Sequence, residues 1–208
     1  MRSSSLSQEM IEQTIRFHGH SCPGLAIGMR VAELALNEFG HAADEEVVAV
    51  VETDMCAVDA VQFLMGCTFG KGNLVHLDYG KNAFSFYRRS DGKGLRIVVK
   101  PELFQTEDDL VALQKKAARS ELSAEEKERL ETSRKGRIKK IMESDLKNLF
   151  EVKPHEGPVP RRARILESLA CESCGERAME SRTRRLMGKT LCIPCFDALE
   201  NKLLRVSK

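Results

Sequence analysis

The sequence predicts an α+β protein with a small cysteine-rich module near its C-terminal end. Three observations lead to this fold class. Residues 1–100 mix helical and strand patterns, the next fifty residues are dense in charge and favour helix, and two CxxC pairs lie near the end of the chain. The predicted parts are an α+β domain over 1–104, a charged helical arm over 105–150, a proline-containing linker over 151–170 and the cysteine-rich module over 171–208.

Two helices are predicted before the first strand. Apolar side chains between Met10 and Phe17 recur at helical spacing, and residues 23–39 are apolar around much of their circumference. Pro23 suits the first turn of a helix, because its missing N–H would have no partner there, and Gly40 is a plausible stop. We therefore expect residues 23–39 to form the central buried helix.

The sheet is predicted from β-branched and alternating segments. Residues 47–53 form a β-branched run typical of a buried strand, and residues 56–65 return to helical spacing. Three more strands are expected over 73–79, 83–89 and 95–100, the last two joined by a Ser-Asp-Gly turn. Together these elements predict helices packed on a small, mostly antiparallel sheet.

The charged arm leaves two interpretations open. Residues 124–150 place Ile138 and Met142 at i,i+4 spacing within a strongly helix-forming stretch. Such a helix either packs on the main domain with a solvated outer face or serves as a connecting, dimerising arm, and the charge pattern does not separate the two. Because the arm and a lone small module bury little apolar surface in one copy, we expect a homodimer.

The stretch with the most reactive side chains is His18-Gly19-His20-Ser21-Cys22-Pro23-Gly24. Cys22 immediately precedes the predicted central helix, whose free N–H groups and dipole favour a thiolate. His18 and His20 lie close by as ligands or proton carriers. The alternative is a tight Gly/Pro turn with incidental histidines, but the residue types favour a reactive or metal-holding corner.

Cys56 is predicted to occupy an equivalent position, because it follows a strand and opens a helix. Glu52 and Asp59 flank it and offer carboxylates to a ligand set. The alternative for Cys56 is a small buried apolar residue, and Cys67, which has none of these features, is expected to be structural.

We expect Cys22 and Cys56 to meet in one cleft with a histidine. The candidate second metal site is His18, His20, Cys22 and Cys56, with Glu52 or Asp59 as a further ligand. Thiolate and imidazole together suit zinc, nickel or iron. If three protein groups bind the ion, its fourth position stays open for chemistry or for transfer of the metal.

A short glycine-rich loop is a candidate anion site. It comprises Gly70, Lys71, Gly72 and Asn73. Backbone N–H groups in such loops hold anions, and the lysine adds a cation. It is not a Walker loop, since GxxxxGK[ST] is absent, and a simple glycine turn with a solvated lysine is an equal alternative.

The two CxxC pairs predict one structural zinc ion bound by Cys171, Cys174, Cys192 and Cys195. Gly175 follows the first pair, as a zinc knuckle requires, and residues 196–204 are expected to form a helix with Phe196, Leu199, Leu203 and Leu204 on one side. A knuckle, a hairpin turning at Gly188 and a ligand-bearing helix describe a treble clef. The segment also resembles zinc fingers of the DksA/TraR type.

Three motifs of the front domain are specific in combination. They are FHGHSCPGLAIGMR over 17–30, E-x-x-x-C-x-x-D-A-x-Q over 52–62, and GCTFGKGNL followed by DYGK over 66–81. Together they resemble the family of the FmdE-like proteins, named after FmdE of formylmethanofuran dehydrogenase. The resemblance implies an accessory subunit of a molybdenum or tungsten enzyme whose pterin and iron–sulfur sites belong to other subunits. Many members occur without that enzyme.

The charge and the cysteines of the chain indicate its cellular compartment and its possible partners. The chain has a net charge of +2, no apolar h-region at its start and no apolar run of membrane-spanning length, so a reducing cytoplasm without membrane contact is expected. Residues 151–208 carry 12 Lys/Arg and 8 Asp/Glu, a mildly basic balance that permits nucleic-acid contact without establishing it.

These features favour a metal-binding protein with a Cys/His cleft, and they leave open whether it is an enzyme. One alternative is a thiol-dependent enzyme that uses Cys22 or Cys56 as nucleophile with a histidine as base. The other is an interaction module whose finger docks on a protein or a nucleic acid. The basic run supporting the second alternative is Arg182, Arg184, Arg185 and Lys189.

Overall fold

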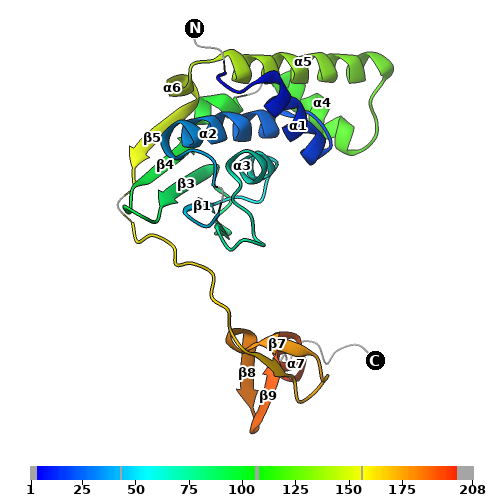
Figure 1. Ribbon diagram of the computed structural model, residues 1–208. Coiled ribbons are helices and arrows are strands. Elements are labelled where there is room, and N and C mark those ends of the chain that lie inside the picture. Colours follow the sequence, from blue (N-terminus) through cyan, green and yellow to red (C-terminus); the bar gives the residue numbers. More distant parts are fainter. Residues whose placement is uncertain (1–3, 43, 106–107, 156, 201–208) are drawn as a thin grey trace. The chain divides into compact units, whose positions relative to one another are not determined.

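The structure is a computed structural model that describes residues 4–42, 44–105, 108–155 and 157–200 (Figure 1). The chain folds as two compact units, Met1–Arg162 and Ala163–Lys208. No helix in the described ranges is both long and apolar enough to cross a lipid bilayer.

The first unit is a mixed α+β domain, which confirms the predicted fold class. Its helices are α1 (Gln8–His18), α2 (Pro23–Phe39), α3 (Ala57–Met65), the 3₁₀ turn η1 (Pro101–Phe104), α4 (Asp108–Ala118), α5 (Ala124–Glu143) and α6 (Leu146–Leu149). Its strands are β1 (Val47–Val51), β2 (Leu74–His76), β3 (Ala83–Arg88), β4 (Gly94–Val99) and β5 (Phe150–Pro154). The strand order is β2-β1-β3-β4-β5; the β1–β2 pairing is parallel and the other three pairings are antiparallel.

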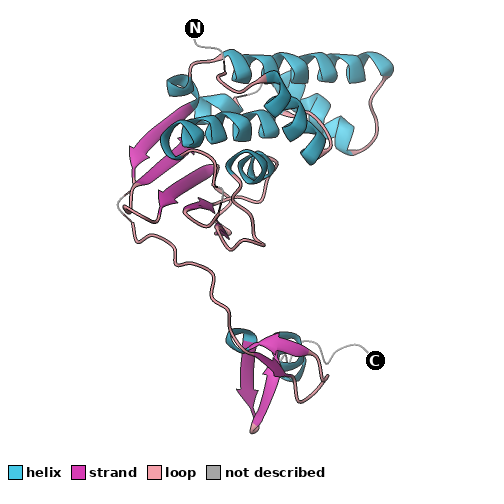
Figure 2. Ribbon diagram, viewed as in Figure 1, coloured by secondary structure: helices cyan, strands magenta, loops and turns pink. Residues whose placement is uncertain are grey.

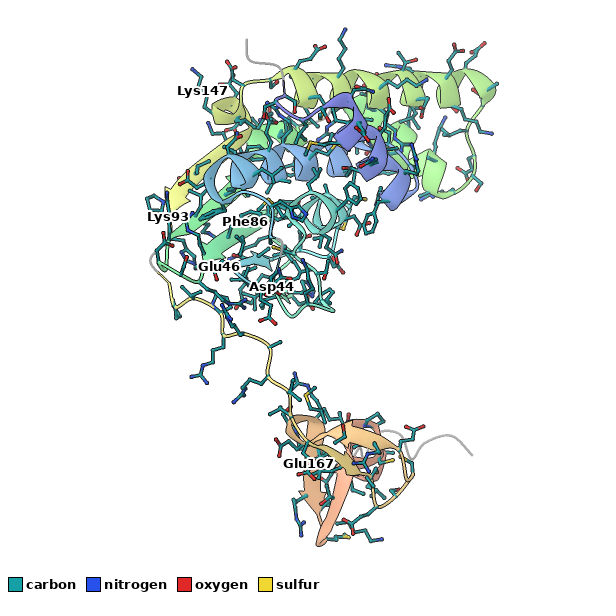
Figure 3. The ribbon with its side chains drawn as sticks, viewed as in Figure 1. Asp44, Glu46, Phe86, Lys93, Lys147 and Glu167 are labelled. Atoms are coloured by element: carbon teal, nitrogen blue, oxygen red, sulfur yellow. The ribbon has the colours of Figure 1, made fainter. Side chains whose placement is uncertain are left out.

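The two faces of the sheet carry different neighbours. Because side chains alternate along a strand, Val47, Ala49 and Val51 of β1 face the main core, whereas Val48 and Val50 face the other side. Figure 2 shows the helices gathered on the core face. Fully buried residues of the core include Phe86 on β3 (Figure 3).

The central helix α2 is buried as predicted, and its packing depends on a glycine. A Cβ atom added to Gly28 would lie 2.6 Å from the Cα of Ala57 and closer still to the Ala57 carbonyl oxygen. Only a residue without a side chain permits this approach of the two backbones. Since Ala57 is the first residue of α3, the contact brings the start of α3 against α2.

The charged arm packs on the domain, as the first of its two interpretations proposed. Ile141 on α5 is fully buried in the main core, and the half-buried Ile138 and Met142 pack against the same core. Arg30 of α2, itself buried, donates to Glu33 at 2.5 Å and to the carbonyl oxygen of Ser144 at 2.6 Å, which ties the end of α5 to α2. The arm is therefore part of the first unit.

The structure corrects the expected start of the linker. Residues 150–154 form β5, which pairs with β4 through Val99↔Phe150 and Ile97↔Val152. Proline is tolerated there because β5 is an edge strand. The chain stays on the sheet beyond β5: Val159 packs on the far-face cluster, and Arg89 donates to the carbonyl oxygen of Pro160 at 3.2 Å.

The second unit consists of two short hairpins, the 3₁₀ turn η2 (Glu180–Arg182) between them, and a helix. The hairpins and the helix are β6 (Ser168–Ala170) paired with β7 (Arg177–Met179), β8 (Thr183–Leu186) paired with β9 (Lys189–Cys192), and α7 (Ile193–Glu200). Met187 and Gly188 both have positive φ, as a two-residue type I′ hairpin turn requires. The helix begins three residues earlier than predicted, and the predicted Leu203 and Leu204 lie outside the described residues.

Candidate metal centres

Three side chains of the first unit meet where three helices end or begin. His18 is the last residue of α1, Cys22 is the N-cap of α2, and Cys56 is the N-cap of α3. One ligand atom from each residue lies within 4.8 Å of the other two. The two sulfur atoms are thus close enough to share one ion with Zn–S bonds of about 2.3 Å.

Asp59 sets the orientation of the His18 ring. Its Oδ2 lies 2.7 Å from His18 Nδ1, and because a carboxylate only accepts hydrogen bonds, the proton of the neutral ring resides on Nδ1. His18 Nε2 then presents its lone pair toward Cys22 Sγ, 3.8 Å away. Gln62 donates to the other Asp59 oxygen at 3.3 Å. A carboxylate behind a histidine is the usual support of a metal-bound imidazole.

Two features hold the sulfur atoms together. The Leu25 backbone N–H donates to Cys22 Sγ at 3.2 Å, so the thiol caps α2 in the way a serine or threonine would. Gly24 leaves room for both cysteines, since a Cβ there would lie 3.2 Å from Cys56 Cβ and 3.9 Å from Cys22 Sγ. The close approach at Gly28 was not predicted, although a glycine inside a helical pattern is a signal for such a contact.

The pKa of the Cys56 thiol is raised, whereas its position at a helix start led us to expect a stabilised thiolate. Burial raises its pKa, and the neighbouring Cys22 raises it further through a hydrogen bond and charge. The Cys56 side chain makes no capping hydrogen bond to α3. Cys56 therefore favours the neutral thiol at physiological pH unless a cation is bound, because a coordinated metal deprotonates a thiol.

Three of the predicted ligands, His20, Glu52 and Asp59, are not part of the three-atom cluster. His20 is exposed, and its ring lies tilted by 39° against the His18 ring, with centroids 4.5 Å apart. Glu52 is buried at the end of β1 and forms an ion pair with Arg96 of β4, with Oε2 3.1 Å from Nη2. The neighbouring strands thus direct Glu52 to Arg96, and Asp59 contacts the site through His18 instead of through the thiols.

The glycine-rich loop uses its polar groups internally. Lys71 Nζ donates to the carbonyl oxygen of Ala42 at 3.1 Å. The buried Asn73 amide donates to the carbonyl oxygen of Val47 at 3.0 Å and accepts from the Thr68 N–H at 2.9 Å. These contacts give Lys71 and Asn73 a structural role, and anion binding at this loop stays a prediction. Burial also raises the pKa of Cys67 to about 11, in keeping with a structural thiol.

The second unit brings its four cysteines together as predicted. Ligand atoms of Cys171, Cys174, Cys192 and Cys195 all lie within 4.8 Å of one another. The Cys192 N–H donates to Cys171 Sγ at 3.3 Å, and backbone N–H groups led by that of Cys174 lower the pKa of Cys171 to about 6. A thiolate held by backbone N–H groups suits a zinc knuckle, so the donor set fits a structural zinc ion.

Comparison with known proteins agrees with the division of the chain into two units. The family model described as "FmdE, Molybdenum formylmethanofuran dehydrogenase operon" matches residues 17–151, and "Prokaryotic dksA/traR C4-type zinc finger" matches residues 164–201. The chain is similar to a crystal structure of an FmdE-like protein, named for tungsten formylmethanofuran dehydrogenase, from Syntrophus aciditrophicus. That similarity has 25% identity and a TM-score of 0.63, and it covers 95% of this chain and 98% of the other.

A curated relative extends beyond the length of this chain. It is a "Probable S-adenosyl-L-methionine-binding protein" of Archaeoglobus fulgidus, 38% identical over 194 residues. The match covers 86% of this chain and 50% of the relative, so the chain spans about half of that protein. The family match over residues 17–151 covers the three-residue cluster, Asp59 and most of the first unit. The chain therefore belongs to the FmdE family and carries a C-terminal C4-type zinc finger.

Proposed function

We propose that the first unit holds one transition-metal ion through His18, Cys22 and Cys56, and that the fourth coordination position receives a ligand or substrate. The observation that carries this proposal is the convergence of three donor atoms within 4.8 Å at three helix termini. Asp59 supports the proposal, since a ring fixed by a carboxylate has its free nitrogen directed at the thiols.

The donor set indicates which ions fit. Two thiolates and one neutral imidazole nearly balance a divalent cation, which lowers the electrostatic cost of a half-buried site. Thiolate and imidazole ligands select zinc, nickel or iron over magnesium or calcium. When bound, such an ion supplies a Lewis-acid centre. The protein residues then hold the ion, and Asp59 keeps His18 in its metal-binding tautomer.

Metal analysis of the anaerobically purified chain tests the proposal. We expect two ions per chain after reconstitution with zinc, nickel or iron, one in each unit. Cys22→Ser should lower the count to one, whereas Cys67→Ser, which removes a thiol outside both clusters, should keep it at two. Cobalt substitution adds a spectroscopic readout, because thiolate–cobalt bands at the first site should disappear in Cys22→Ser. A wild-type chain that binds a single ion under all three metals contradicts the proposal.

The competing hypothesis is that the first unit is a thiol-dependent enzyme, and assays of the metal-free chain test it. The raised pKa of Cys56 does not favour that residue as a free nucleophile. If the metal-free chain retains an activity that alkylation of Cys22 or Cys56 abolishes, the nucleophile hypothesis replaces the metal site.

Two finer roles follow from the relatives and are proposals for this chain. The description of the matching family supports an accessory role beside a formylmethanofuran dehydrogenase, which co-purification with the molybdenum or tungsten subunits tests. The A. fulgidus relative supports binding of S-adenosyl-L-methionine. Calorimetric titration of S-adenosyl-L-methionine into the metal-loaded chain and into Cys22→Ser shows whether it binds and whether the metal cluster takes part.

A further inference from the structure

We propose that the β8–β9 hairpin of the second unit binds the phosphate backbone of duplex nucleic acid. This binding site is separate from the metal cluster of the first unit and does not depend on it. The hairpin carries Arg184 and Arg185 on β8 and Lys189 on β9, and all three side chains are exposed.

Charge is segregated within the module. From residue 182 to residue 190 the chain carries Arg182 and the three hairpin cations, and it carries no acidic residue. The preceding fifteen residues, 167–181, carry four glutamates and one arginine. Although the described part of the module is balanced overall, its β8–β9 hairpin is therefore strongly positive relative to its β6–β7 hairpin. A polyanion is attracted to the first of these and repelled by the second.

The positive charges of the hairpin are not neutralised within the described residues. No carboxylate oxygen there lies within 4.0 Å of the Arg184, Arg185 or Lys189 side-chain nitrogens. Arg185 donates to the carbonyl oxygen of Gly188 at 2.8 Å and to the Thr190 hydroxyl at 3.3 Å, and both are neutral acceptors. In the first unit, by contrast, buried Arg30 and half-buried Arg96 are paired with glutamates.

The hairpin is anchored at its base and free at its tip. Leu191 and Cys192 on β9 are buried, and Cys192 is one of the zinc-binding cysteines. The Glu172 carboxylate accepts the Thr190 N–H, which fixes β9 to the first knuckle. At the other end, Met187 is 92% exposed. A bound zinc ion therefore presents a short, rigid ribbon whose base does not need to reorganise on binding.

This shape and charge match a nucleic-acid groove. The major groove of B-DNA admits a two-stranded β-ribbon, and arginine forks match phosphate geometry. Met187 at the exposed tip is an apolar group, and apolar side chains contact the thymine methyl group in the major groove. An acidic protein surface offers charge without regularly spaced phosphates, so we favour the duplex and make the acidic polypeptide an outcome of the test.

Salt-dependent binding of the full, zinc-loaded chain provides the measurement. The probes are a fluorescein-labelled 20-base-pair DNA duplex, an RNA duplex of the same sequence, and poly-L-glutamate of similar charge as competitor. Three phosphate contacts predict a slope of about −2.7 for log K against log salt on DNA, or a loss of about 40-fold between 50 and 200 mM salt. The two duplexes distinguish the DNA and RNA sources of the phosphate backbone.

Matched variants separate the hairpin from the general charge of the chain. Arg184→Gln with Arg185→Gln should reduce the slope by about 1.8, since two contacts are lost. Lys135→Gln with Lys139→Gln removes the same charge from exposed positions on α5 and should leave the slope unchanged. Met187→Ser should weaken binding without altering the slope. Zinc content, measured for every variant, shows that the module is folded.

Three outcomes overturn the proposal. They are the absence of duplex binding at 50 mM salt, an equal loss of slope in both double variants, and poly-L-glutamate competing as well as unlabelled duplex at equal charge. Binding to either duplex that shows the predicted slope and the selective effect of Arg184 and Arg185 supports it.

Discussion

Replacing Gly28 by alanine tests whether the α2–α3 contact holds the first metal site together. A Cβ at Gly28 would lie 2.6 Å from the Cα of Ala57, and Cβ contacts shorter than 3.0 Å essentially never occur in proteins. The start of α3 must therefore move away by at least about 0.4 Å, and Cys56 is the residue next to Ala57. Metal–ligand distances tolerate only about 0.2 Å, so the movement separates Cys56 from the other two donors.

The same crowding destabilises the fold. Overpacking a close backbone contact costs about 1–3 kcal/mol, and a domain of this size loses roughly 2–4 °C of melting temperature per kcal/mol. We expect Gly28→Ala to lower the melting temperature of the metal-free first unit by roughly 2–12 °C. We also expect it to weaken metal binding at the first site, while the zinc content of the second unit stays the same.

Circular dichroism melting and chelator competition measure these two effects. Gly136→Ala is the matched control, since Gly136 lies in α5 and nothing lies within 4 Å of an added Cβ there. Because alanine favours helix over glycine, the control should melt at the same temperature or higher. If Gly28→Ala melts like Gly136→Ala and keeps full metal affinity, the backbone contact does not position Cys56 and the reasoning is refuted.

Four further predictions concern other parts of the chain. Cys192→Ser should release the zinc of the second unit and make residues beyond about 163 sensitive to protease, while the first unit stays folded, as limited proteolysis with mass spectrometry will show. Asp59→Asn should weaken metal binding at the first site by about 10–100-fold in chelator competition, whereas Asp54→Asn, at an exposed position outside the cluster, should not. The folded-state pKa of Cys67 is raised to about 11 from an ordinary value of 9.0, so its stabilising effect is complete below pH 9 and is lost as the pH rises toward 11. Urea unfolding between pH 8 and 11 should show a steeper loss of stability in the wild type than in Cys67→Ala, and equal slopes would contradict the assignment. Finally, we propose that the chain is a homodimer, and a monomer mass by light scattering at micromolar concentration would rule this out.

Several features of this protein follow from short-range sequence patterns. The span of α2 is readable from Pro23 and Gly40, because proline suits a first helical turn and glycine follows a last one. The zinc module is readable from two CxxC pairs, because a CxxC turn places two thiolates on one ion whatever surrounds it. The pattern locates the strands of the first hundred residues to within a few positions, but it ends the arm at residue 150 and assigns residues 151–154 of β5 to the linker, since three prolines nearby obscure the pairing with β4.

The choice of ligands in the first unit required the tertiary structure. The sequence identifies His18, His20, Cys22, Cys56, Glu52 and Asp59 as candidates, and it cannot rank them, because they come from segments up to 41 residues apart. The sheet register directs Glu52 to Arg96, and the packing of α1 on α3 directs Asp59 to His18. Local sequence thus determined which chemistry the chain carries, through residue types and turn spacing. The packing of the helices and strands decided which donors meet, because contacts between distant segments depend on how closely their backbones approach, as they do at Gly28.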